Sequence, residues 1–442
     1  MSSGAVTTLA ARIAVRARSP VGVGLAGKFA EGLALCLFIT VLPRALGPAD
    51  FGRLALAVAV VQIAGASMSF GGPVTLSRFV PVQRGAERAA VARLLVTRMA
   101  GWRALLLLAA AVVAVGFAIA EPERVPAGLA ALLLLAIALD STATLLAQAS
   151  LGLGISALWS YRLPVQTSLL VVAALCLVPP FGAWGAAAAV AAAAAVTALV
   201  AVVIVMPVLL RVRPAERLPP GVGRFAAIQG LNGFLALCVA RGGIVAVAWL
   251  HPSASEVGYI GLATGIALGG VYAVGQAFTL QLPGLSVLAA ADLPAAEARA
   301  RRLARAGVLA VAPGTVAIAA LVPFVLVPII GHRYEPAVGA VIIGMAMIPM
   351  APVSALVAQT AALRLRPQVA LAALTAGATV FTAVALTAVD PFGAAGAAAA
   401  MTAGAAATAL TGAALLRDAV PLRLLAVAVA GALAIAALGF TA

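Results

Sequence analysis

Five ionisable side chains lie inside long apolar stretches of the sequence: Lys28, Glu31, Arg78, Asp140 and Arg241. A charge near the centre of a bilayer costs at least about 2.5–3.5 kcal/mol, so such a side chain faces protein, water or a ligand instead of lipid. Lys28 and Glu31 are close enough in sequence to share one face of a helix. We predict that these five residues line a polar cavity. The alternative at each position is a structural ion pair, or a side chain that snorkels to the membrane surface.

Hydrolytic or metal chemistry has no comparable candidates. His251 and His332 fall in short loops, without the nearby cysteine, histidine or paired carboxylates that a metal site or an acid–base pair needs. Gly-x-Gly pairs such as Gly22/Gly24 lack the strand–turn–helix context of a nucleotide site. We therefore expect a protein that is not an enzyme and that uses no metal or other cofactor.

The elements that must position these charges are membrane helices. Of the 442 residues, 64% are hydrophobic and 9% are charged, whereas about a quarter of an average soluble domain is charged. Apolar runs of about 20 residues, the length that crosses a bilayer as a helix, recur along the chain. The sequence predicts an all-α, polytopic membrane protein with about twelve spans, at 21–42, 54–79, 103–120, 127–150, 164–179, 185–207, 225–250, 257–283, 307–330, 338–362, 369–389 and 395–416. An apolar tail at 424–440 is just long enough for one more.

A repeated motif divides the chain into two similar halves. The stretch PFGAWGA at residues 180–186 returns as PFGAAGA at 391–397, and LALC at 33–36 returns at 235–238. We predict two six-helix repeats around a central cavity, the first at 21–207 and the second at 225–416. A segment at 1–20 precedes them, a linker at 208–224 joins them, and a tail at 417–442 with one possible further helix follows.

The arginines predict the orientation in the membrane. With the N-terminus in the cytoplasm, the inside arginines are Arg84, Arg88, Arg93, Arg98, Arg103, Arg162, Arg211, Arg213, Arg217, Arg224, Arg299, Arg301, Arg302, Arg305, Arg364, Arg366, Arg417 and Arg423, and only Arg44, Arg53, Arg124 and Arg333 fall outside. Because each repeat has an even number of helices, both enter the membrane in the same sense, as in transporters whose halves rock about a central site. The net charge of +15 thus reflects topology, and nucleic acid is not an expected partner.

Three further patterns carry expectations. The basic segments 84–103 and 297–306 mix arginines with apolar residues, which predicts that they lie on the anionic inner leaflet or recognise a lipid-borne substrate. The run Gly71-Gly72-Pro73 is expected to interrupt the second helix. Gly261, Gly265 and Gly269 are spaced for a close contact with another helix.

Four motifs, in this order, resemble the polysaccharide and O-antigen flippases of the multidrug/oligosaccharidyl-lipid/polysaccharide (MOP) superfamily. They are LPRALGPADFG at 42–52, SRFVP at 77–81, VPPFGAWGAA at 178–187 and GHRYEPA at 331–337. The resemblance extends over residues 21–416 and implies two six-helix lobes around a V-shaped cavity. It implies movement of a sugar on a polyprenyl pyrophosphate from the inner to the outer leaflet of the cell membrane.

The resemblance also suggests roles for the five charges. Cavities in the family are often cationic, which fits Lys28, Arg78 and Arg241 as partners of a pyrophosphate. Glu31 and Asp140 then serve in coupling to a proton or sodium ion, or in charge pairing. The alternative is an ion-coupled exporter of small cationic or amphipathic molecules from the same superfamily. Sparse aromatic and acidic residues within the spans favour the flippase.

Overall fold

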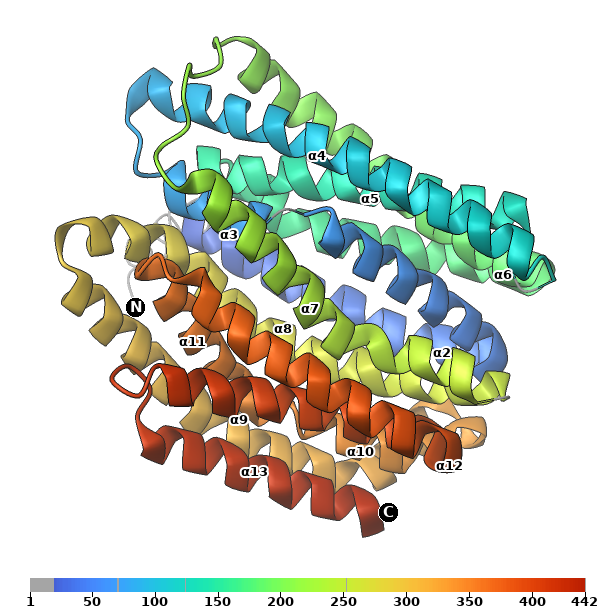
Figure 1. Cartoon of the computed structure of the whole chain (residues 1–442). Coiled ribbons are helices and arrows are strands. Elements are labelled where there is room, and N and C mark those ends of the chain that lie inside the picture. Colours follow the sequence, from blue (N-terminus) through green and yellow to red (C-terminus); the bar gives the residue numbers. More distant parts are fainter. Residues whose placement is uncertain (1–19, 70, 124, 252, 442) are drawn as a thin grey trace, which may run out of the picture.

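The computed structural model describes residues 20–69, 71–123, 125–251 and 253–441, and all regular structure in these ranges is helical (Figure 1). The elements are α2 (Pro20–Ser67), α3 (Gly72–Phe79), α4 (Gly85–Ala120), α5 (Ala127–Leu153), α6 (Ser156–Leu210), α7 (Val222–Leu250), α8 (Ala254–Ala291), α9 (Leu293–Ile330), η1 (His332–Ala337), α10 (Val338–Met345), η2 (Ile348–Met350), α11 (Ala351–Leu363), α12 (Pro367–Leu415) and α13 (Leu422–Thr441). The predicted fold class is confirmed.

Ten helical segments in the described ranges are long and apolar enough to cross a membrane. Three of them, α2, α6 and α12, each consist of two helices, because a glycine with positive φ interrupts the element. Figure 1 shows that the chain reverses direction at these points. Each predicted span therefore has a helical counterpart. The span 54–79 is the second half of α2 with α3, and the span 338–362 is α10, η2 and α11. The apolar tail forms α13, which also satisfies the length and composition of a span. The chain is a multi-pass membrane protein.

The repeated PFGAxGA motif forms the reversals within α6 and α12. Gly182 and Gly393 adopt nearly the same backbone conformation, with φ 52° and ψ −122° or −125°, a region that side chains strongly disfavour. A methyl group on Gly185 would collide with the carbonyl oxygen of Leu177, and one on Gly396 with that of Ala388. The motif recurs because the same tight helical hairpin is built twice.

The glycines of α8 pack against α2. A Cβ on Gly261 would lie 2.6 Å from the Cβ of Ala55, and one on Gly265 would lie 3.2 Å from Ile39. Gly269, on the same face of α8, packs against Leu35. Near the start of α8, Gly258 lies against the backbone of Pro48. The expected close helix contact is confirmed, and it joins the first half of the sequence to the second.

Two of the resemblance motifs meet beside this contact. Tyr334, in η1, is 1% exposed and its ring packs edge-on against Phe51, with 6.5 Å between the ring centroids. The ring of Tyr259 at the start of α8 lies 5.9 Å from that of Tyr334. These motifs therefore form a packed junction at the end of the bundle that is poor in arginine.

The basic segments 84–103 and 297–306 are continuous with longer helices and are not separate elements. They are the first turns of α4 and α9, which begin at Gly85 and Leu293. No helix-breaking sequence separates them from the apolar turns that follow. Their apolar faces pack inside the protein, as Val91, Leu95 and Met99 show on α4.

Arginines fasten these first turns to the ends of later helices. Arg88 donates two hydrogen bonds to the carbonyl of Gly152 at the end of α5, at 2.9 and 2.7 Å. In the second half, Arg364 at the end of α11 makes a bidentate pair with Glu297 on α9, at 2.6 and 2.9 Å, and also pairs with Asp418. The contact in the first half is an arginine on a backbone carbonyl, whereas the contact in the second half is a set of ion pairs.

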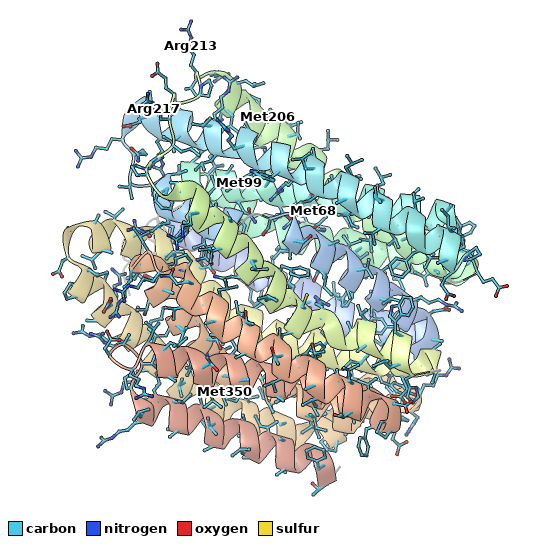
Figure 2. The ribbon with its side chains drawn as sticks, in the orientation of Figure 1. Met68, Met99, Met206, Arg213, Arg217 and Met350 are labelled. Carbon is cyan, nitrogen blue, oxygen red and sulfur yellow. The ribbon has the colours of Figure 1, made fainter. Side chains whose placement is uncertain are left out.

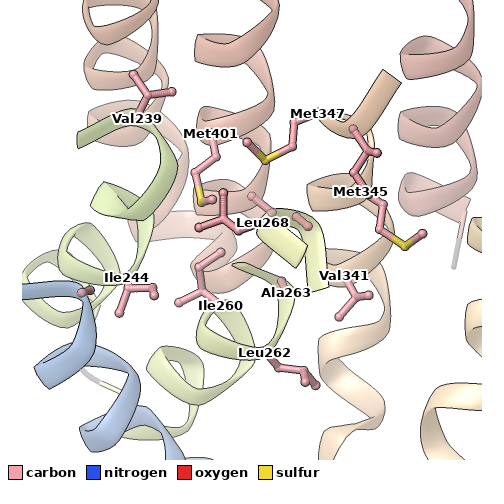
Figure 3. Packing of buried hydrophobic residues seen from close by; sticks show 14 of the residues in the cluster. Val239, Ile244, Ile260, Leu262, Ala263, Leu268, Val341, Met345, Met347 and Met401 are labelled. Carbon is pink, nitrogen blue, oxygen red and sulfur yellow. The ribbon is translucent and has the colours of Figure 1, made fainter. Parts of the chain in front are cut away.

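The second half has a continuous apolar core. Figure 3 shows Ile244 of α7, Ile260 and Leu268 of α8, Val341 of α10 and Met401 of α12 packed together. On the outside, α4 presents a run of exposed apolar side chains, including Leu105, Leu108, Val112, Phe117 and Ile119. Exposed apolar surface of this extent is the lipid-facing side of a membrane helix.

Candidate functional site

Asp140 on α5 lies in a buried polar cluster between helices of the first half. Its Oδ1 accepts hydrogen bonds from Nη2 of Arg162 and from Nε2 of Gln166, both on α6 and both at 2.7 Å. A third residue, Arg103 of α4, is 4% exposed and donates to the carbonyl oxygen of Ser141. The cluster contains two guanidinium groups and one carboxylate, so it carries a net positive charge.

Arg103 and Arg162 are two of the arginines that the sequence assigned to the inside. They lie within α4 and α6, because these helices begin at Gly85 and Ser156, well before the predicted spans at 103 and 164. The side chain of Arg162 is only 9% exposed. The useful signal in the sequence was the absence of proline between residue 85 and Arg103, which favours one helix through both.

Arg241 lies on α7, in the second half, and interacts with the side-chain hydroxyl of Tyr272 on α8. Its Nε is buried and has no hydrogen-bond partner among the described residues. Asp140, a carboxylate for which charge pairing was predicted, is paired with Arg162 and not with Arg241.

Arg78 sits near the end of α3, the short helix that follows the predicted interruption. Gly71, with φ 64°, breaks the helix after Ser67 and lets the backbone approach Gln229 and Ala226 of α7. Arg78 is partly buried, and its Nε has no partner within the described part of the chain. The break therefore brings a cation of the first half to the helix that carries Arg241.

The first helical half of α2 carries the remaining two predicted site residues. Glu31 is partly exposed there. The side chain of Lys28 lies outside the described part of the structure. The structure thus brings Asp140 together with Arg103, Arg162 and Gln166, and distributes Glu31, Arg78 and Arg241 over α2, α3 and α7.

The site arginines share unused hydrogen-bonding capacity. The Nε atoms of Arg78, Arg103, Arg162 and Arg241 are buried without a partner in the described ranges, and so is Nη2 of Arg103. An unmade hydrogen bond to a buried charged group is expensive, so these donors are positions where an acceptor is strongly favoured. Chemically, each of these donors suits an oxygen atom of an anion.

The loop histidines do not form a metal site in the described chain, where no group of three or more His, Cys, Asp and Glu side chains is placed to hold an ion. His332 is 92% exposed, with its Nδ1 4.0 Å from a carboxylate oxygen of Glu335. His251 accepts a hydrogen bond from the backbone of Ser253 at 3.3 Å.

No family model and no curated protein matches the sequence, whereas solved structures match the fold. The lipid II flippase MurJ in an inward closed conformation superposes with a TM-score of 0.63 at 11% identity, covering 93% of this chain and 90% of that one. The MATE multidrug transporter DinF-BH gives 0.63 at 18% identity, covering 91% and 94%. An inward-facing multidrug resistance MATE family transporter of the MOP superfamily gives 0.63 at 15%, covering 93% and 99%. The chain has the fold of these transporters, which include both a lipid flippase and multidrug carriers.

Proposed function

We propose that this chain, with its MOP transporter fold, flips a polyprenyl-pyrophosphate-linked oligosaccharide from the inner to the outer leaflet for the synthesis of cell-surface polysaccharide. In this proposal it works by alternating access in the cell membrane, with the N-terminus in the cytoplasm. The halves at 21–207 and 225–416 are the lobes that rock against each other. The substrate, the surrounding lipids and a coupling proton or sodium ion are its partners.

The observation that carries the proposal is the set of buried guanidinium donors without a partner in the described ranges, on Arg78, Arg103, Arg162 and Arg241. A pyrophosphate offers many acceptor oxygens and two or more negative charges, so it would satisfy such donors. A cationic drug would meet repulsion there. We assign ion coupling or charge pairing to Glu31 and Asp140, the two carboxylates of the predicted site, and Asp140 is paired with Arg162.

The alternative is an ion-coupled exporter of cationic or amphipathic molecules, and the fold is equally compatible with it, since MATE multidrug transporters share the fold. The two functions differ in the charge of the substrate. The cluster of Asp140, Arg103 and Arg162 carries a net positive charge, which favours an anionic substrate and therefore the flippase.

The test uses proteoliposomes that contain the purified chain and a polyprenyl-pyrophosphate-linked disaccharide. Flipping exposes the sugar to periodate added outside, so oxidation should exceed the half expected for a static, symmetric bilayer. Parallel vesicles loaded with ethidium should show no efflux under a proton or sodium gradient. Gradient-driven ethidium efflux without sugar flipping would establish the exporter instead.

A further inference from the structure

A pocket of 670 Å³ lies between α4, the linker after α6 and the start of α7, at the arginine-rich end of the bundle. On α4 it is lined by Leu94, Arg98 and Trp102, which succeed one another at four-residue spacing and so form one face of the helix. Val222 and Gly223 of α7 form the opposite wall. The volume is within the range of ordinary ligand sites. We refer to it as the α4–α7 pocket.

The pocket is apolar inside and basic at its mouth. Leu94, Met99 and Val222 supply apolar walls, while Arg98 and Arg217 are exposed at the rim. Figure 2 shows Arg217 and Arg213 on the linker, at the end of the bundle where α4 begins. The acidic residue of the lining is Glu216, so its charged groups leave a net positive charge.

The surrounding surface places this pocket at the boundary between headgroups and hydrocarbon. Trp102 is half exposed, and tryptophan prefers that boundary. Beyond it, α4 presents the lipid-facing run that starts at Leu105, whereas the turns before it carry arginines. An amphiphile in the pocket would therefore have its polar end beside Arg98 and its apolar end beside the hydrocarbon.

We propose that the α4–α7 pocket binds one anionic phospholipid from the leaflet at the arginine-rich face. Its phosphate lies between Arg98 and Arg217, and an acyl chain lies against Leu94, Met99 and Val222. Net positive charge selects an anionic headgroup over a zwitterionic one, because each basic residue near a membrane surface contributes about 1 kcal/mol toward anionic lipid. Since α4 and α7 belong to different halves of the sequence, the bound lipid bridges them. This site is separate from the proposed transport path and does not depend on it.

The test is native mass spectrometry of the purified full-length chain with equal amounts of phosphatidylglycerol and phosphatidylcholine. We expect one phosphatidylglycerol to be retained in preference. Arg98→Gln with Arg217→Gln should weaken its retention about thirtyfold, which corresponds to about fivefold for each arginine. The control is Arg213→Gln. It removes one positive charge from the linker but none from the pocket lining, and it should leave retention unchanged.

A second variant tests the cavity itself. Gly223 lines the pocket and a Cβ there meets nothing within 4 Å, so Gly223→Phe should project into the pocket, fill it and abolish retention. Gly101→Phe, also at an open position but on α4 outside the lining, is its control. Thermal unfolding and size-exclusion profiles establish that each variant is folded. Equal retention of the two lipids, or retention that survives in folded Gly223→Phe, would overturn the proposal.

Discussion

Guanidinium groups set the chemistry of this protein at the scale of single residues. Arginine remains protonated at any accessible pH, so burial of Arg103, Arg162 and Arg241 must be compensated by acceptors. The acceptors found are Asp140, a backbone carbonyl and a tyrosine hydroxyl, and they leave several donors unused in the described ranges. Substitutions at Arg241 and Asp140 separate the substrate-binding donors from the structural ones.

Arg241→Ala should reduce flipping of the lipid-linked disaccharide at least tenfold at normal membrane abundance, because a charged hydrogen bond is worth about 1.5–3 kcal/mol. Arg241→Lys should retain partial activity, since a point charge still attracts phosphate. Tyr272→Phe, which removes only the hydroxyl partner of Arg241, serves as the control and should have a smaller effect. Full flipping by Arg241→Ala would refute the assignment of Arg241 to the substrate.

Asp140→Asn should destabilise the fold by about 3–5 kcal/mol, because it leaves Arg103 and Arg162 buried without their counter-charge. The double variant Asp140→Asn with Arg162→Gln should recover much of this loss, since it removes one excess cation. Thermal unfolding followed by tryptophan fluorescence measures both. Arg213→Gln, at an exposed position outside the α4–α7 pocket, is the control and should shift the Tm little. Equal destabilisation in the single and double variants would show that Asp140 and Arg162 are not energetically coupled.

At the scale of elements, glycine determines where helices turn, break and touch. Gly182 and Gly393 reverse α6 and α12, Gly71 separates α2 from α3, and Gly258 and Gly261 let α8 pack on α2. Each position combines small size with either a positive φ or a close backbone approach. Alanine-rich turns follow both hairpins and are buried, for example at Ala186 and Ala397, so the two arms pack at short distance.

Gly182→Ala and Gly185→Ala should each lower the yield of monodisperse protein and its Tm. The first forces a side chain into a strained backbone region that costs about 1–3 kcal/mol, and the second drives a methyl group into the carbonyl of Leu177. Gly116→Ala on α4 is the matched control, because a Cβ there meets nothing within 4 Å. Wild-type yield and Tm for Gly185→Ala would mean that the hairpin is looser than described.

At the scale of the whole molecule, the α2–α8 contact holds the two halves together at the arginine-poor end. Gly52 of α2 and Gly258 of α8 meet there, with a Cβ on Gly52 only 2.8 Å from the backbone nitrogen of Gly258. The Phe51–Tyr334 junction lies alongside. Opening of the molecule at the arginine-poor end would require α2 and α8 to separate. A substitution in this contact should therefore change the balance between the closed and open conformations.

Gly52→Val should shift the molecule toward opening at the arginine-poor end, because its side chain cannot fit against α8. With Cys36, Cys176 and Cys238 replaced by alanine, Val257→Cys supplies a buried reporter on the facing helix. Its labelling by an impermeant maleimide added outside intact cells should accelerate in the Gly52→Val background. Gly32→Val, at an open position on the first half-helix of α2, should leave labelling unchanged. Slow labelling in both backgrounds would argue against opening at this contact.

The sequence alone determined the membrane class, the approximate helix spans and the repeated PFGAxGA motif, because apolar run length and glycine backbone preferences act over a few neighbouring residues. It also identified Asp140 and Arg241 as costly charges. Their partners were decided by tertiary structure, since helix packing brings Arg162 to Asp140 and Tyr272 to Arg241 from distant parts of the chain. The burial of Arg103 and the α4–α7 pocket arise in the same way. A local pattern shows that a charge needs compensation, but only the packing of helices determines which group supplies it.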